Sequence, residues 1–485
     1  MKLRTKAKWT DAITALETKN KALSYQAATE GIVLLENKDV LPMPAGKIAL
    51  YGAGAGKTIK GGSGSGEVIE RHAVSIREGL EDRGFEILTN DWLDRYEELW
   101  AKGREEFIAG MRKKLRKFNT EMLAEMMAAE YRYPHGDAIR ADDLSDDTDY
   151  CIYVVSRQSG EGSDRRKKDY MISKVERDHL EACTAHYKHV ILVINTGASF
   201  DVSFVEEFEN IDAVVFFCQL GQEGGYALAD VLTGKITPSG KLAATWANSY
   251  KDVPFGKEYS FIGNDLNHAE YREGIYVGYR YYDSFNVTPR YAFGHGLSYT
   301  DFEVQTTSVK VDGTKVHVSV SVKNIGDTYA GKETVQLYVS SPAGKLEKEY
   351  QSLAAFAKTD VLKPGESQDL ELSFSMEYIA SYDEETASMI LEAGDYILRV
   401  GNSSRNTEVG GVATLSKTVV ISKHSNLCVS EKPIQTLHRA IETIQVPDVE
   451  KVILDVNAFH TEVMDYAKGD EAFEPKVEAM LNKLG

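Results

Sequence analysis

The chain contains 485 residues, of which 56 are Lys or Arg and 74 are Asp or Glu, so its net charge is −18. This length exceeds what a single hydrophobic core usually organises, and 42% hydrophobic with 27% charged residues is typical of globular rather than disordered proteins. The acidic balance argues against nucleic acid and anionic membranes as partners, because both are bound through clustered Lys and Arg side chains.

Residues 1–247 alternate short apolar runs with segments of helical periodicity. Apolar residues at three- and four-residue spacing predict helices over 24–37 and 171–187. Apolar runs predict strands at residues 47–54, 85–89, 150–156, 189–197, 213–221 and 241–247. Strands that are continuous Val and Ile runs between helices are typical of a mostly parallel sheet with helices on both faces. We therefore expect an α/β sandwich domain over 1–247.

The rest of the chain has a different pattern. Residues 248–300 are rich in Tyr and Gly, with too many turn residues for a helix and too many aromatic residues for a flexible linker, so we expect an ordered strap packed against a domain. From 301 to 422 the hydrophobic period changes to two, which predicts an all-β sandwich of the immunoglobulin or fibronectin type III class. Residues 423–485 have the composition of a helical, acidic linker or tail.

Targeting and metal-binding signals are missing from the sequence. The N-terminal residues contain no apolar stretch long enough for a signal peptide, and no window approaches the roughly 18 consecutive apolar residues of a membrane span. The four cysteines are scattered, without metal-ligand spacing or a disulfide framework. These features predict a cytoplasmic protein with no membrane partner and no bound metal.

Two glycine-rich runs follow the first predicted parallel strand, at residues 52–58 and 61–66. A P-loop would need glycine where Tyr51 stands, and a dinucleotide fingerprint would need glycine where Lys57 stands. We therefore expect no nucleotide cofactor, which disfavours an unrelated nucleotide-binding domain. The first run is either a long turn that needs positive φ angles or, with the second, a loop that contacts a ligand at the carboxyl edge of the sheet.

A single glutamate, Glu161, lies among glycines directly after the predicted strand 150–156. The neighbouring glycines have no side chains that would shield this glutamate, so it can approach a substrate. It can then serve as a proton donor, provided that its pKa is raised. The neighbouring Arg157, Arg165 and Arg166 would instead lower its pKa, so this chemistry would need a compensating carboxylate or desolvation. A solvated loop charge is the alternative interpretation.

Other candidate residues carry weaker signals. His268 and His295 are isolated, and isolated histidines are more often hydrogen-bonded structural groups than ligands. Aromatic residues clustered in the strap could stack on a sugar or attach the strap to the β-sandwich. They are Tyr276, Tyr279, Tyr281, Tyr282 and Phe285. No HExxH or GxSxG motif supports a metalloprotease or a serine hydrolase.

Several long motifs, in the correct order, resemble the non-barrel part of glycoside hydrolase family 3, the β-glucosidase and β-xylosidase group. The matching pieces of the first 302 residues are 28–52, 61–68, 159–165, 190–202, 221–246 and 276–302. Residues 323–339 continue the likeness into the fibronectin type III-like domain of that family. The resemblance covers the chain from about residue 20 to about residue 420.

The resemblance implies a retaining mechanism with two carboxylates on two domains. The position that matches the acid/base of the family is Glu161, in the string SGEGSDR, whereas the nucleophile of the family is an Asp from a separate (β/α)₈ barrel. Further residues of these loops are expected to bind substrate or to lie at an interface. They are Arg157, Gly62, Ser63, Gly64, Asp164 and Arg165.

Neither a Ser-Asp-Trp nucleophile motif nor a set of eight barrel repeats occurs in the sequence. The order of the pieces resembles a smaller, inverted-order group of the family, in which the barrel comes last. A retaining glycosidase needs its two carboxyl groups about 5 Å apart, and this chain supplies one of them. We therefore expect the acid/base-bearing portion of a retaining β-glycosidase, which hydrolyses a β-glycoside when a barrel completes it in cis or in trans. The alternative is a non-catalytic carbohydrate-binding or scaffold protein derived from the same family.

Overall fold

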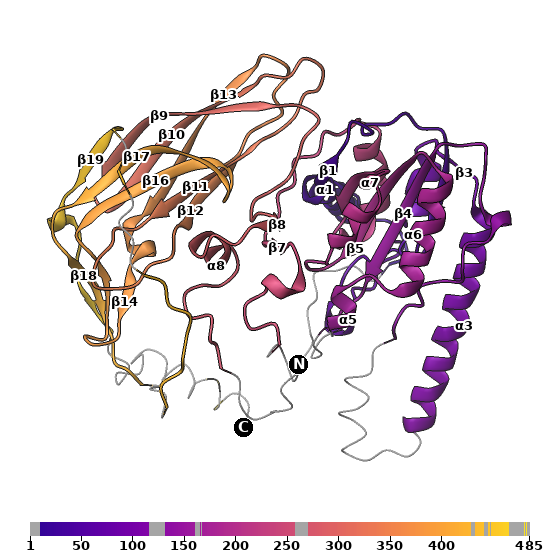
Figure 1. Ribbon diagram of the computed structural model, residues 1–485, viewed down its shortest axis with the longest axis horizontal. Helices are drawn as coiled ribbons and strands as arrows, with labels where there is room; N and C mark the ends of the chain where they lie inside the picture. The colour runs from indigo at the N-terminus through magenta and orange to yellow at the C-terminus, as the bar shows by residue number, and fades with distance from the viewer. Residues whose placement is uncertain are drawn as a thin grey trace.

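The computed structural model describes residues 10–115, 131–160, 165, 167–257, 270–427, 432–440, 445–446, 448–464, 480 and 482. An α/β part formed by the first half of the chain stands beside an all-β part formed by the second half (Figure 1). The predicted fold class, an α/β sandwich followed by a β-sandwich, is confirmed. Within the described ranges, no helix combines the length and hydropathy needed to cross a bilayer.

The α/β part is organised around a six-stranded sheet in the order β1-β6-β5-β4-β2-β3. Its strands are β1 (Val33–Asn37), β2 (Lys47–Tyr51), β3 (Glu86–Ile87), β4 (Tyr150–Arg157), β5 (His189–Thr196) and β6 (Ile211–Phe216). All neighbours in this sheet are parallel except β1, which runs antiparallel to β6. The central strands β4 and β5 are buried at every residue after the first, as expected for strands covered on both faces.

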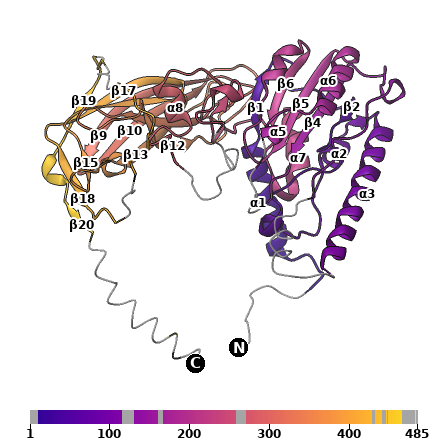
Figure 2. The ribbon, with the colours of Figure 1, turned by 60° about the horizontal axis from the view of Figure 1, so that its bottom comes forward.

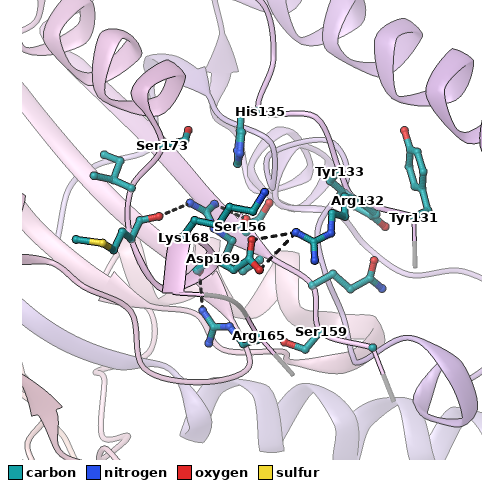
Figure 3. Close-up of a pocket in the computed structure, with 15 residues that line it drawn as sticks. Tyr131, Arg132, Tyr133, His135, Ser156, Ser159, Arg165, Lys168, Asp169 and Ser173 are labelled. Atoms are coloured by element: carbon teal, nitrogen blue, oxygen red, sulfur yellow. Dashed lines mark hydrogen bonds and ion pairs between the residues drawn. The ribbon is translucent and has the colours of Figure 1, made fainter. Parts of the chain in front are cut away.

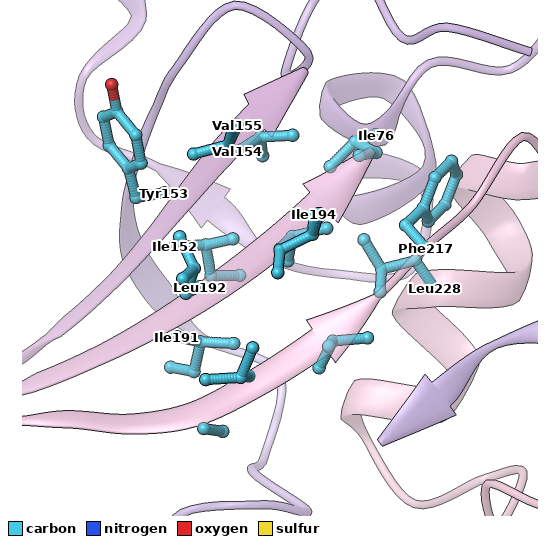
Figure 4. Packing of buried hydrophobic residues seen from close by; sticks show 14 of the residues in the cluster. Ile76, Ile152, Tyr153, Val154, Val155, Ile191, Leu192, Ile194, Phe217 and Leu228 are labelled. Carbon is cyan, nitrogen blue, oxygen red and sulfur yellow. The ribbon is translucent and has the colours of Figure 1, made fainter. Parts of the chain in front are cut away.

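Helices cover both faces of this sheet (Figures 1 and 2). They are α1 (Ala15–Gly31), α2 (Ile76–Asp82), α3 (Asn90–Leu115), α5 (Lys167–Tyr170), α6 (Lys174–His186) and α7 (Gly224–Leu232). On one face, Tyr153 of β4 is hydrogen-bonded to His179 of α6 at 3.0 Å. On the other, Ile76 of α2 and Leu228 of α7 pack beside Ile194 of β5 (Figure 4).

The helix predicted over 24–37 is wrong in its second half. Helix α1 ends at Gly31, Ile32 is already extended, and the next five residues form the edge strand β1. Val33 pairs with Phe216 on β6, and the apolar residues of this run are buried in the core. Pairing with a strand far along the chain therefore outweighs the helical spacing of the local sequence.

The strand predicted over 241–247 does not join the sheet. Only β7 (Trp246–Ala247) is extended, and it pairs antiparallel with β8 (Pro289–Tyr291) of the strap. Leu242 donates its backbone N–H to the carbonyl of His295 and accepts from the N–H of Gly294, both at 2.8 Å. The strap thus satisfies the backbone groups that a sheet neighbour would have satisfied.

The strap contains a helix that its turn-rich sequence did not predict, α8 (Tyr279–Ser284). Gly278 precedes it with φ of 60°, and Tyr279 and Tyr282 of the helix are buried. The hydroxyl of Tyr279 accepts from the N–H of Leu353 in the β part at 2.8 Å. Burial of its aromatic side chains, rather than local propensity, stabilises this helix.

The β part contains three sheets, in the orders β13-β10-β9, β12-β11-β16-β17-β19 and β14-β15-β18-β20. The strands are β9 (Phe302–Asp312), β10 (Lys315–Asn324), β11 (Thr334–Ser340), β12 (Ser352–Lys358), β13 (Ser367–Ser375), β14 (Ser381–Asp383), β15 (Ser388–Leu391), β16 (Gly394–Ser403), β17 (Asn406–Leu415), β18 (Val419–Lys423), β19 (Lys451–Leu454) and β20 (Glu462–Val463). The predicted period of two is confirmed on β10, where Val316, Val318, Val320 and Val322 are all fully buried.

The sequence predicts a helical tail over 423–485. This prediction is wrong where the structure describes the strands β19 and β20. β19 pairs in parallel with β17, and β20 pairs in parallel with β18. Leu454 and Phe459 are buried in the core of the β part. β17 and β18 lie at sheet edges with backbone groups available for pairing. Hydrogen bonding to these edges stabilises the tail segments as strands, which the composition of the tail does not indicate.

Charged contacts join the two parts. Glu30 of α1 lies 2.9 Å from Lys332 and 3.2 Å from Lys358 of the β part. The hydrogen bond from Lys332 is the main reason that the pKa of Glu30 falls to about 2. Lys241 and Glu333 form a further ion pair at 2.9 Å, with both side chains largely buried. The α/β part and the β part therefore share a specific interface.

Candidate functional site

The two loops singled out in the sequence meet at the carboxyl edge of the parallel sheet. β2 and β4 are parallel neighbours, so the segments that follow them emerge side by side. The N–H of Ser63 donates to the carbonyl of Ser159 at 3.1 Å, and a Cβ on Gly62 would lie 3.5 Å from the same carbonyl. Gly64, the third predicted residue of this loop, opens a short 3-10 turn with φ of 78°.

Glu161 and Asp164, together with His268, lie outside the described residues. Described residues end at Gly160 on one side of the predicted acid/base and resume with Arg165 on the other. What the structure describes is therefore the surroundings from which this turn begins and to which it returns.

The first glycine-rich run is a turn required by close backbone packing. Gly52 has φ of 99°, and a Cβ there would lie 2.2 Å from the carbonyl oxygen of Val154. Asn195 of β5 holds the far end of the turn: its Oδ1 accepts from Ile59 N–H at 2.7 Å, and its Nδ2 donates to Ile59 O at 2.8 Å. The interpretation of this run as a turn with positive φ is confirmed for Gly52.

Arg157, the last residue of β4, forms a buried ion pair with Glu176. Its Nη1 lies 2.6 Å from Oε1 of Glu176, and its Nη2 lies 2.7 Å from Oε2. The guanidinium also donates to the carbonyls of Ser156 at 2.8 Å and Met171 at 2.9 Å. Both amino groups are thus engaged with the protein, and they tie the end of β4 to the segment that precedes α6.

The carboxylate of Glu176 offsets the charge of Arg157, one of the three arginines near Glu161 in the sequence. Burial alone would raise the pKa of Glu176, but hydrogen bonds from His135 and Arg157 hold it well below its ordinary value. The carboxylate of Glu176 therefore stays ionised and offsets the charge of Arg157. Arg165 donates to the carbonyl of Asp169 at 2.9 Å and to that of Ser199 at 3.3 Å, which anchors the returning end of the turn.

A cavity of about 500 Å³ is lined by described residues that include Gly160 and Arg165 (Figure 3). Its walls come from the segment before β4, the end of β4 and the region from α5 to the start of α6. The lining includes Tyr131, Arg132, Tyr133, His135, Ser156, Ser159, Gly160, Arg165, Lys168 and Asp169. Such a set of donors, one carboxylate and two phenol rings can bind a ligand that carries several hydroxyl groups.

Sequence reasoning missed most of this cavity. Arg132 lies 3.2 Å from Asp169, a contact across thirty-seven residues of sequence that no local pattern indicates (Figure 3). His135 Nδ1 lies 3.3 Å from Oε1 of Glu176. The dense aromatic and basic string at 131–135 was the one local signal available. Among the described residues, no group of three or more His, Cys, Asp and Glu side chains is arranged to hold a metal ion.

The strap aromatics attach the strap to the β part. Tyr279 stacks on Phe293 with ring centroids 4.7 Å apart and meets Tyr338 of β11 edge-on at 6.0 Å. Tyr276 is buried against Phe285, with centroids 4.9 Å apart. These contacts favour the packing interpretation over sugar stacking for Tyr276 and Tyr279.

His295 is a structural group. Its Nε2–H donates to the carbonyl of Leu35 at 3.0 Å, and its ring stacks on Tyr291 with centroids 5.4 Å apart. Burial is the main cause of a lowered pKa for His295; the nearby Lys241 lowers it further, and the Leu35 carbonyl and Glu36 oppose the shift. The imidazole is therefore neutral in the folded protein.

The lowered pKa of His295 predicts a loss of stability in mild acid. The unfolded chain binds this proton near pH 6.5 and the folded chain only at lower pH, so the free energy of unfolding falls as the pH drops below about 6.5, by at most about 1.4 kcal/mol per pH unit for one group. Replacing His295 with Gln keeps a donor for Leu35 but removes the titration. Urea unfolding between pH 5 and pH 8 (roughly the window where His titrates) measures the free energy of unfolding of the variant and the parent chain. This free energy should depend less on pH in the variant, and equal slopes would contradict the role of His295.

Comparison with known proteins matches both parts of the chain. Residues 32–299 match the glycosyl hydrolase family 3 C-terminal domain, and residues 333–404 match the fibronectin type III-like domain. β-Glucosidase A of Butyrivibrio fibrisolvens is 33% identical over 83% of this chain and 52% of the relative. A β-glucosidase of Ruminococcus albus is 32% identical over 86% of this chain and 43% of the relative.

Solved structures agree with these matches. β-Glucosidase 3B from Thermotoga neapolitana, in complex with α-D-glucose, superposes with a TM-score of 0.69 at 38% identity, over 83% of this chain and 55% of that chain. A β-glucosidase from Paenibacillus barengoltzii gives a TM-score of 0.71 at 30% identity, over 88% of this chain and 48% of that chain. The chain spans about half the length of the curated relatives it matches. It belongs to glycoside hydrolase family 3, of which it carries the C-terminal α/β domain and the fibronectin type III-like domain.

Proposed function

We propose that this chain is the acid/base-bearing portion of a retaining β-glycosidase and that a (β/α)₈ barrel, on the same chain or on a partner, completes the site. Glu161 would protonate the glycosidic oxygen as the leaving group departs and would then deprotonate the water that releases the sugar. A carboxylate on the barrel would form the covalent intermediate. The substrate class is a carbohydrate β-glycoside.

The observation that carries this proposal is the meeting of the loops after β2 and β4 beside a cavity of about 500 Å³. Open α/β sheets bind ligands at the carboxyl ends of their strands, and the turn that contains Glu161 begins there. The relatives named as β-glucosidases and the solved complex with glucose support a glucoside as the first substrate to test.

The proposal predicts that hydrolysis depends on completion of the site. The chain alone should not turn over p-nitrophenyl β-D-glucoside. Supplying the part of the Thermotoga neapolitana enzyme that this chain does not cover, as a fusion or as a second chain, should produce release of nitrophenol, because the nucleophile is then available.

Two controls separate the outcomes of that experiment. The added part alone must be inactive, so that turnover reports the completed site. Turnover by this chain alone contradicts the half-site proposal. No turnover by a folded, completed assembly with Glu161 intact favours a non-catalytic carbohydrate-binding protein.

A further inference from the structure

A second cavity, of about 460 Å³, lies where the strap meets the α/β part. Its lining comes from the turn after β5 at residues 198–199, from the region of α5, from residues 245–256 at the junction with the strap, and from strap residues 270–282. Arg165 lines both this cavity and the cavity of about 500 Å³ described above, so the two adjoin through one residue. Neither the matched family description nor the proposed mechanism uses this second cavity.

Aromatic and aliphatic side chains form most of its walls. Tyr250, Phe255 and Tyr282 supply aromatic rings, and Val253 and Val277 supply aliphatic surface. This composition, apolar walls with a few polar groups, is typical of small-molecule sites.

Neighbouring side chains hold two of these rings in place. Tyr250 lies beside Tyr170 with centroids 5.8 Å apart, and the ammonium of Lys167 lies 4.5 Å from its ring. The guanidinium of Arg272 lies 4.5 Å from the ring of Phe255. Lys167 and Tyr170 are themselves part of the cavity wall, and their contacts with Tyr250 hold that ring in place, which lowers the entropic cost of packing a ligand against it.

Polar groups without partners also line the cavity. Glu270 and Glu273 both line it, and among the described residues neither carboxylate has a hydrogen bond or an ion pair. The hydroxyl oxygen of Thr245 is buried in the cavity wall, also with no hydrogen-bond partner there. A buried hydroxyl left unpaired is unfavourable, and rotation about χ1 can turn it toward a ligand.

These groups together select a class of ligand. A pyranose ring has an apolar face of C–H groups, which packs on aromatic rings, and a rim of hydroxyls, which donate to carboxylates. The side chains of Glu270 and Glu273 can accept hydrogen bonds from such hydroxyls, and Arg165 and Lys167, which also line the cavity, can donate to their oxygens. With two acidic and two basic side chains in its lining, the cavity has no excess charge of one sign, which fits a neutral sugar ring.

We propose that this cavity is a saccharide-binding site that holds one pyranose ring of a β-linked oligosaccharide, with Glu273 accepting from its hydroxyls. Because Arg165, four residues after Glu161 in the sequence, lines this cavity, the ring held there belongs to a longer substrate of the same enzyme. That last assignment rests on the proposed function, whereas sugar binding by the cavity does not.

Isothermal titration calorimetry of the full chain with cellobiose tests the site without turnover. Ala198 is an exposed residue of the cavity wall, so Ala198→Leu fills the cavity from its rim without altering the core. We expect this variant to weaken cellobiose binding by more than about tenfold. Glu273→Gln keeps an acceptor but removes its charge, and should weaken binding by about three- to tenfold.

Glu408→Gln is the matched control, because Glu408 is an exposed carboxylate on β17, outside the cavity lining. It should bind cellobiose like the parent chain, and all variants should keep the parent's urea unfolding midpoint. No binding of cellobiose by the parent chain, or an unchanged Kd for Ala198→Leu, overturns the proposal. If Ala198→Leu loses cellobiose binding and the completed enzyme hydrolyses no glycoside, the saccharide-binding site is retained. The proposed function is then rejected instead.

Discussion

Replacing Glu161 with Gln is expected to lower kcat/KM of the barrel-completed enzyme for cellobiose by about 10²- to 10⁴-fold. The glucose leaving group is a poor one and needs a proton as the glycosidic bond breaks, and the amide cannot supply it. The measurement is steady-state hydrolysis by the completed assembly, with the variant and the parent chain supplied at equal concentration.

A substrate with a better leaving group distinguishes lost acid catalysis from a damaged fold. 2,4-Dinitrophenolate leaves without protonation, so the first step on a dinitrophenyl β-D-glucoside should lose far less than on cellobiose. Glu181→Gln, which alters an exposed carboxylate on α6, should leave both rates unchanged. Equal losses on the two substrates for Glu161→Gln would contradict its role as the acid.

Replacing Arg157 with Met is expected to lower the free energy of unfolding by about 3–5 kcal/mol. Glu176 is 2% exposed and would be left as a buried carboxylate without its bidentate partner. The same change releases the end of β4 from the carbonyl of Met171. Urea unfolding of the full chain measures the loss.

A second two-point ion pair, formed by the next residue of α6, controls for geometry. Arg177 contacts both carboxylate oxygens of Glu207, at 2.7 and 3.0 Å, but the two side chains are 34% and 56% exposed. Arg177→Met should therefore cost less than about 1 kcal/mol, because solvent screens exposed pairs. A double variant, Arg157→Met with Glu176→Leu, should recover most of the loss. If the variants at Arg157 and Arg177 lose the same stability, burial is not what makes the inner pair important.

The parallel strands could be predicted because burial on both faces leaves a local mark. β4 and β5 are apolar at successive positions, and no helix or exposed strand requires that pattern. The run that forms β1 has no such mark: its apolar residues fit a helix as well as a strand, and only the free edge of β6 decides between them. β19 and β20 are strands for the same reason, at open edges of the β part.

The candidate site also has contacts that the sequence indicates and contacts that it does not. The meeting of Gly62 and Ser63 with Ser159 follows from parallel strands that end at one edge, so the sequence was enough to place the two loops together. Asn195 is different, because its amide acts on a turn more than a hundred residues earlier, and an isolated Asn at a strand end indicates nothing by itself. Glu176 lies in a helix whose sequence shows only an ordinary capping box.

The sequence by itself determined the succession of an α/β part and a β-sandwich and the family, because periodicity and motifs are properties of neighbouring residues. Only the tertiary structure decided that Glu176 neutralises Arg157. It alone decided that the strap closes a cavity against the α/β part. Both results depend on the distance between side chains remote in sequence, and that distance is set by packing rather than by any local pattern.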